Sequence, residues 1–191
     1  MQNLFVSGSD LVMQNISADA YIEPFPHIIY HNFYDDKELN LIWEELDFYT
    51  KPNKLFDVED YKGVVGYTKA KAIHLDSVYI GRNRKISNIL DISRKVFNNQ
   101  VLEPFAKLHD SCSFANSSNY DVTKVRYYHN GDYYKPHTDK YYEFLAFSYF
   151  YREPKRFDGG GLIFPKYDYE FNCENNSLIM MPAWVEHGVS E

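Results

Sequence analysis

From residue 114 onward the sequence consists of short β-prone runs separated by clusters of Asn, Gly and Pro, and this pattern constrains the fold more than any other feature. The runs are VTKVRYY, FLAFSYFY, GLIFP and SLIMMP. Several short strands at such spacing are typical of a β-sandwich or a β-barrel. The 18 tyrosines and 14 phenylalanines agree, because aromatic side chains favour half-buried sheet surfaces. We therefore expect residues 114–191 to form a β-core.

The first half of the chain has a different pattern of apolar and polar residues. Residues 1–20 are polar and aperiodic, which predicts a loose arm. Asp35 and Glu38 fit a capping box at the start of DDKELNLIWEELDFYT, whose apolar residues recur at helical spacing. The apolar residues of NRKISNILDISRKVFNN predict a second helix, which continues towards Leu108. The run AIHLDSVYI, residues 72–80, is expected to be a strand.

Length and charge narrow the class of protein. A chain of 191 residues suits one domain, in which residues 21–113 supply a strand and supporting helices for the β-core. The formal charge of −7 argues against nucleic acid or an anionic membrane surface as the main partner. No run is long enough for a membrane span, and the first residues lack the pattern of a signal peptide. Cys112 and Cys173 show no disulfide or metal pattern, so we expect a cytoplasmic protein.

The segment HNGDYYKPHTDK, residues 129–140, holds the first candidate site residues. His137 and Asp139 lie two apart behind a glycine turn, and alternate side chains of a strand point to one face of a sheet. His187, just after the run SLIMMP, offers a second imidazole. Two imidazoles and one carboxylate are the ligands of facial-triad Fe(II) sites, which keep coordination positions open. A structural zinc site would bring four ligands rich in Cys, and the sequence has no such set.

A His-x-Asp triplet alone is weak evidence for a metal site. The chain contains an internal control, because His74 and Asp76 have the same spacing in the segment HLD. The other histidines are expected to be surface residues or hydrogen-bonded core residues: His27, His31, His109 and His129.

The context of His137 resembles a known family. The segment YHNGDYYKPHTD is similar to the Y-x-x-G-x-x-Y-x-x-H-x-D pattern of Fe(II)- and 2-oxoglutarate-dependent oxygenases of the prolyl 4-hydroxylase type. YFYREPKRFDGGGLIFP and NNSLIMMPAWVEHGV resemble the two later motifs of that family, in the family's order. The resemblance covers residues 122–189 well and residues 21–50 loosely.

The resemblance implies a double-stranded β-helix, which is a jelly roll of the cupin type, with supporting helices. It implies that His137, Asp139 and His187 bind Fe(II) and act in catalysis, and that Tyr128 hydrogen-bonds 2-oxoglutarate. The implied reaction is hydroxylation of a substrate, with succinate and CO2 as co-products and ascorbate as a possible reductant. Asp139 favours hydroxylation over halogenation, because the related halogenases leave the carboxylate position empty for a halide. The substrate would be a protein side chain, such as a prolyl residue, or a small molecule, and residues 49–79 are expected to form a lid or rim.

The sequence departs from the family pattern at two places. Gly161 stands where the family has a Glu, at a position usually peripheral to the iron. The family's Arg or Lys for the 2-oxoglutarate tail carboxylate lies about nine or ten residues after the distal histidine, beyond Glu191, so we expect the chain as given to be truncated. Arg126 and Arg152 lie near matching segments and are the alternative anchors.

Two other functions remain open at this point. The first is a cupin-like metalloenzyme that does not use 2-oxoglutarate. The second is a non-catalytic β-sandwich that binds a carbohydrate or peptide, with His137 and Asp139 merely hydrogen-bonded together. Neither the substrate nor the oligomeric state follows from the residues.

Overall fold

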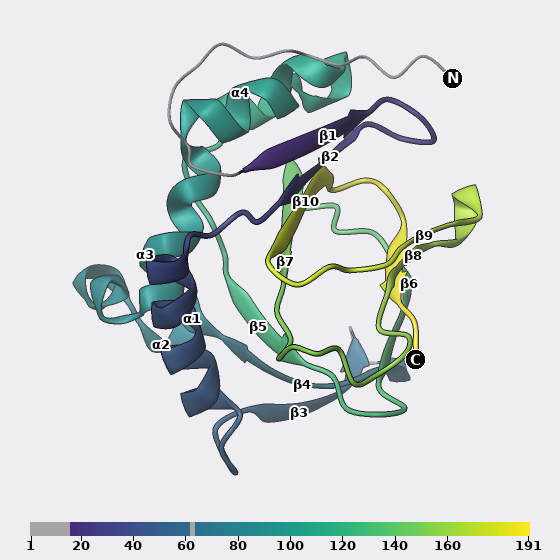
Figure 1. Ribbon diagram of the computed structural model, residues 1–191. Coiled ribbons are helices and arrows are strands. Elements are labelled where there is room, and N and C mark those ends of the chain that lie inside the picture. The colour runs from purple at the N-terminus through teal and green to yellow at the C-terminus, as the bar shows by residue number, and fades with distance from the viewer. Residues whose placement is uncertain (1–15, 62–63) are drawn as a thin grey trace.

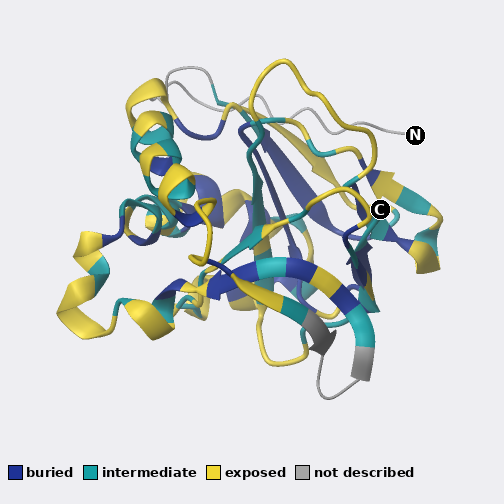
Figure 2. Cartoon of the chain, turned by 90° about the horizontal axis from the view of Figure 1, so that it is seen from below, coloured by how far each residue is buried: buried dark blue, intermediate teal, exposed yellow. Residues whose placement is uncertain are grey.

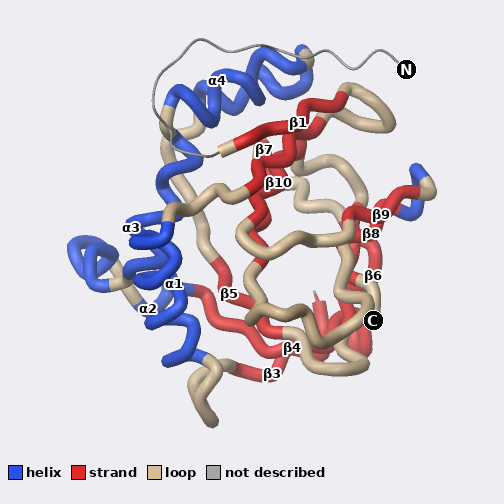
Figure 3. Tube along the Cα trace, viewed as in Figure 1, coloured by secondary structure: helices blue, strands red, loops and turns tan. Residues whose placement is uncertain are grey.

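The computed structural model describes residues 16–61 and 64–191, and this part of the chain is mostly β (Figure 1). Most helices lie along one side and one end of the molecule, and strands and loops make up the rest (Figure 3). The expected class, mostly β with supporting helices, is therefore confirmed. The strands are β1 Ser17–Tyr21, β2 His27–His31, β3 Phe56–Tyr61, β4 Val64–His74, β5 Lys124–Tyr127, β6 Tyr133–His137, β7 Phe144–Tyr149, β8 Leu162–Phe164, β9 Tyr169–Phe171, β10 Ser177–Pro182 and β11 His187–Val189.

The helical segments fall between these strands. The α-helices are α1 Asp36–Tyr49, α2 Leu75–Val78, α3 Asn88–Ser93 and α4 Asn99–Leu108. The 3-10 helices are η1 Gly81–Ile86, η2 Arg94–Phe97, η3 Asp110–Ser117 and η4 Pro165–Tyr167. None of the helices in the described residues is both long and apolar enough to cross a membrane.

The strands form two antiparallel sheets. The four-stranded sheet has the order β1-β2-β10-β7. The seven-stranded sheet has the order β3-β4-β6-β11-β8-β9, and β5 also pairs with β4. In both sheets strands distant in sequence are neighbours, so β11, the last strand, lies between β6 and β8.

Strand β10 is the centre of the core, and all six of its residues are buried. Its side chains alternate between two apolar clusters, as the pleat of a strand requires. Leu178 and Met180 pack with residues of α1 and α4, whereas Ile179 and Met181 pack with β8 and β9 of the other sheet. Full burial of such a side chain stabilises a fold by about 1.5–3 kcal/mol. Helices and the second sheet therefore cover opposite faces of β10, and buried residues gather in the central strands (Figure 2).

Helix α1 begins where the sequence predicts. The Asp35 carboxylate accepts a hydrogen bond from the Glu38 backbone N–H at 2.8 Å, and the Glu38 carboxylate accepts one from the Asp35 N–H at 3.0 Å. This is a complete capping box, so the expected helix start is confirmed.

Three local expectations were wrong. Ser17–Tyr21 forms edge strand β1 against β2, so the loose arm does not reach residue 20; residues 1–15 lie outside the described part. The expected strand at 72–80 is the end of β4 followed by helix α2. The single long helix after residue 83 is broken into separate pieces, because Ser87 and Asn98 have extended backbone. Ser87 caps α3 with its side chain instead of continuing a helix.

Candidate metal centre

Three side chains converge at the end of β6 and the start of β11. One ligand atom from each of His137, Asp139 and His187 lies within 4.8 Å of the others. His137 and His187 are 8% and 2% exposed, and their ring centroids are 4.4 Å apart. The structure thus brings together the three residues that the sequence singled out.

The pairing of β6 with β11 explains how two histidines 50 positions apart in the sequence meet. His187 is the direct antiparallel partner of His137, so their side chains leave the sheet on the same face. Gly188 allows this close approach, because a Cβ there would lie 2.6 Å from the Tyr134 carbonyl oxygen. Gly188 was not among the predicted site residues; its position directly after the distal histidine was the available signal.

Backbone carbonyls orient both imidazoles. Nδ1 of His137 donates to the Lys135 carbonyl, and Nδ1 of His187 donates to the Val185 carbonyl, each at 2.9 Å. A carbonyl oxygen only accepts, so Nδ1 carries the proton in both neutral rings and Nε2 carries the lone pair. This is the arrangement in which a second interaction fixes the tautomer of a metal-binding histidine.

Burial keeps these rings neutral. It lowers the pKa of His137 and of His187 below the ordinary histidine value, because a protein interior disfavours the charged imidazolium. The two rings also oppose each other's protonation, which adds to the lowered pKa of His137. Neutral imidazole is the form that binds a metal, so the site is suited to this role at neutral pH.

Asp139 supplies the carboxylate and the open side of the site. Its backbone N–H donates to the Ala183 carbonyl at 3.1 Å, which holds the segment after β6 against the turn before β11. Its Oδ2 lies 3.7 Å from Nε2 of His187, which is longer than a hydrogen bond. Two ligand atoms 3.7 Å apart can bind the same ion, because bonds from His and carboxylate to divalent transition metals are about 2.1 Å long. The Asp139 side chain is 23% exposed, so solvent reaches the site from this side.

The second His-x-Asp triplet forms no such site. His74 ends β4 and is exposed, whereas Asp76 belongs to helix α2. The Asp76 carboxylate pairs with Arg84 and accepts a hydrogen bond from the Thr123 backbone N–H at 2.6 Å. Among the described residues, neither member belongs to a group of three side chains that could hold a metal ion.

Aromatic rings enclose the two imidazoles. The Tyr134 ring stacks on His137 with centroids 3.8 Å apart, and the Phe147 ring of β7 lies 5.4 Å from His187. Phe147 belongs to the four-stranded sheet, so the imidazoles face the space between the two sheets. Tyr67 of β4 donates a hydrogen bond to the Pro136 carbonyl, next to His137. The segment 49–79 thus contributes strands to the sheet beside the site. The side chain of Tyr61 lies outside the described residues.

The structure also places the two arginines and Tyr128. Arg126 of β5 lies over the Tyr134 ring, 4.4 Å from its centroid. Tyr128 is half-buried; burial raises the pKa of its phenol, and an interaction with Arg126 opposes this shift. Arg152 lies elsewhere, paired with Asp47 on α1 and stacked on Trp43. Arg126 and Tyr128 are two positions apart, and this alternation along an extended segment was the signal that both face the same way.

The donor set fits a divalent transition metal with open coordination positions. It contains two neutral imidazoles and one carboxylate, and no cysteine belongs to this group. Such mixed nitrogen and oxygen ligation is typical of non-haem Fe(II), whereas closed structural zinc sites use four ligands. A scan against models of protein families found no match, and no curated protein matches the chain.

Proposed function

We propose that this chain is an Fe(II)- and 2-oxoglutarate-dependent oxygenase with a double-stranded β-helix core. The observation that carries this proposal is the convergence of His137, Asp139 and His187 on one point between the sheets. Two antiparallel sheets with β6 and β11 side by side are compatible with such a core. The motif resemblance around residues 128–139 and 176–189 supports the same assignment.

Each side chain has a defined task in this proposal. His137 and His187 bind the ion through Nε2, and the carbonyls of Lys135 and Val185 hold the rings in position. Asp139 offsets part of the metal charge and leaves the exposed side of the site open. When bound, iron with 2-oxoglutarate and O2 supplies the oxidising chemistry, which converts the oxo acid to succinate and CO2 and a substrate C–H bond to C–OH.

The aromatic enclosure contributes by excluding water. Tyr134 and Phe147 cover the imidazoles, which leaves the Asp139 side for entry of reactants. A hollow of about 320 Å³ adjoins the segment that follows Asp139 and contains Tyr120, Tyr141 and Tyr142 in its lining. The Tyr142 backbone N–H donates to the Asp139 carbonyl at 3.2 Å, so Tyr142, in the lining of the hollow, belongs to the same turn as Asp139. We propose it as the approach for a protein side chain or a small-molecule substrate.

Quenching of protein fluorescence tests the proposal against its two alternatives. Trp184 lies in the turn between β10 and β11, so it reports on the site. We expect anaerobic Fe(II) to quench the fluorescence and 2-oxoglutarate to change the signal again. Quenching by Fe(II) with no response to 2-oxoglutarate would favour a cupin-like metalloenzyme of another class. Absence of quenching would favour a non-catalytic binding module.

A further inference from the structure

Arg126 places a positive charge close to the candidate metal centre. It lies on β5 opposite Ala72 of β4, and its side chain is partly shielded from solvent. The Tyr134 ring contacts the Arg126 guanidinium and also stacks on His137. The charge of Arg126 reaches His137, where it contributes to the lowered pKa. The guanidinium is therefore near the site, although it is not one of its ligands.

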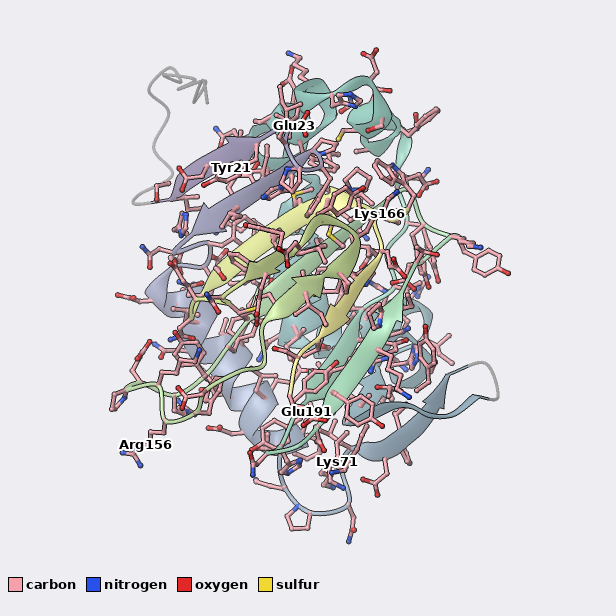
Figure 4. All side chains as sticks on the ribbon, turned by 90° about the vertical axis from the view of Figure 1, so that its right-hand side faces the viewer. Tyr21, Glu23, Lys71, Arg156, Lys166 and Glu191 are labelled. Carbon is pink, nitrogen blue, oxygen red and sulfur yellow. The ribbon has the colours of Figure 1, made fainter. Side chains whose placement is uncertain are left out.

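The other arginines of the chain separate into two groups. Three are paired with carboxylates: Arg84 with Asp76 and Asp121, Arg94 with Asp121, and Arg152 with Asp47. Two are exposed, Arg82 and Arg156, and Figure 4 shows Arg156 pointing outward at the edge of the molecule. Arg126 belongs to neither group, because it is partly buried and no carboxylate among the described residues pairs with it.

The surroundings of Arg126 supply hydrogen-bonding groups, and no carboxylate among the described residues forms an ion pair with it. Nη1 lies 3.5 Å from Oγ1 of buried Thr68, and the Tyr128 phenol interacts with the same guanidinium. Two carboxylates act on the neighbours of Arg126: burial lowers the pKa of Lys124 and the charge of Asp139 opposes this shift, whereas burial raises the pKa of Tyr128 and the charge of Asp132 adds to it. A partly buried cation without an ion-pair partner is less favourable than a paired one, and an anionic ligand would supply the missing partner.

We propose that Arg126 binds the distal carboxylate of 2-oxoglutarate, with the Tyr128 hydroxyl as a second donor. This inference rests on the proposed function, because the oxo-acid end of the same molecule must reach the ion at His137, Asp139 and His187. A guanidinium binds a carboxylate through two parallel hydrogen bonds, which fixes its orientation as well as its charge. Burial keeps the Tyr128 phenol protonated, so it is able to donate. The cation would then come from β5, which precedes the strand that carries the His-x-Asp motif.

Calorimetry with two oxo acids tests this role separately from the metal centre. The protein is first titrated with Mn(II), and the Mn(II) form is then titrated with 2-oxoglutarate and with 2-oxobutyrate, which has the same oxo-acid end but no distal carboxylate. We expect the wild-type protein to bind 2-oxoglutarate roughly ten- to hundredfold more tightly than 2-oxobutyrate, as charge-assisted hydrogen bonds predict. Arg126→Met should remove this preference and leave Mn(II) binding unchanged.

Matched variants complete the test. Arg152→Met removes an arginine that is paired with Asp47, so it should keep the full preference for 2-oxoglutarate. Arg126→Lys retains the charge without the planar guanidinium and should keep an intermediate preference. This variant keeps the test possible if Arg126→Met does not fold. A wild-type protein that binds Mn(II) but not 2-oxoglutarate preferentially, or an Arg126→Met variant that retains the preference, would overturn the role of Arg126. Failure of the wild-type protein to bind Mn(II) would instead contradict the metal centre, and this inference with it.

Discussion

Two His-x-Asp triplets in this chain have the same spacing, but only one of them belongs to the candidate metal centre. His137 ends a strand whose neighbour, β11, brings His187 directly opposite, and Asp139 keeps its carboxylate at the open side of that pair. His74 also ends a strand, but Asp76 is engaged by Arg84 and the Thr123 backbone N–H. Spacing alone therefore does not determine where the two side chains lie, because Asp76 belongs to helix α2 whereas Asp139 follows strand β6. The partners that the fold brings to each triplet decide whether it forms a candidate metal centre or a structural ion pair.

The largest expected effect is on metal affinity. His187→Ala removes one of three ligands, so Mn(II) affinity should fall by more than about a hundredfold, since loss of outer-shell partners alone costs about 10- to 100-fold. His74→Ala should leave the affinity unchanged, because His74 does not belong to the group. Equal loss in the two variants would remove the distinction between the triplets. Calorimetric titration of both variants measures it.

Gly188→Ala tests whether the approach of β11 to β6 creates the site. The added methyl group would meet the Tyr134 carbonyl and the backbone around Lys135 and Pro136. Displacement of these strands should lower the free energy of unfolding by about 2–3 kcal/mol and weaken metal binding together with it. Denaturant unfolding and Mn(II) titration of the same variant check both effects. Unchanged metal affinity would show that the two histidines meet without this close contact.

Asp76→Ala provides the reverse test at the structural triplet. It removes the partner of Arg84 and the acceptor for Thr123, so we expect a loss of about 1–2 kcal/mol in the free energy of unfolding. Metal affinity should not change, because the site lies elsewhere. Asp57→Ala, which removes an exposed carboxylate paired with Lys71, is a matched control that should cost less. A change in Mn(II) binding by Asp76→Ala would contradict the assignment of this triplet.

The smallest expected effect is on the pH dependence of stability. It compares the two histidines at the ends of β2, His27 and His31. Burial lowers the pKa of His27, so its stabilising contribution is complete above about pH 6.5 and is lost as the pH falls through that value towards the folded-state pKa. At His31 burial also acts to lower the pKa, but Glu174 and Asp19 outweigh it and raise the pKa. The contribution of His31 is therefore complete below about pH 6.5 and is lost as the pH rises through its raised folded-state pKa.

Replacement of either histidine should consequently make stability less dependent on pH, on the acid side for His27 and above neutrality for His31. His27→Gln should reduce the acid-side slope of the metal-free protein by no more than about 1.4 kcal/mol per pH unit, and His31→Gln should reduce the slope above neutrality. Denaturant unfolding between pH 5 and 8 measures both slopes. Identical profiles for the two variants would show that neighbouring carboxylates do not set the behaviour of histidine here.

Local patterns predicted the elements whose cause is local. The capping box at Asp35 and Glu38 marked the start of α1, and the apolar run SLIMMP marked β10. The site residues were found in the same way, because their motifs are continuous segments. Ser87 and Asn98 broke the expected long helix through backbone conformation, which apolar periodicity does not report.

Features that depend on distant partners were not predicted. The hairpin of β3 and β4 has a mixed sequence, and its place in the sheet comes from pairing of β4 with β5 and β6. Strand β1 is exposed throughout and is held by its ladder with β2, so no apolar alternation announces it. The position of Arg126 likewise depends on which face of β5 meets Tyr134, and only the folded sheet determines this.

Formation of succinate from 2-oxoglutarate tests the central claim most directly. The wild-type protein, supplied with Fe(II), ascorbate and O2, should convert 2-oxoglutarate to succinate in a reaction that a chelator abolishes. Asp139→Ala should lose this activity because the ion loses its charged ligand, whereas Asp76→Ala, the equivalent change in the other triplet, should retain it. Absence of succinate from the wild-type protein, or full activity in Asp139→Ala, would contradict the assignment of His137, Asp139 and His187 as the centre of an oxygenase.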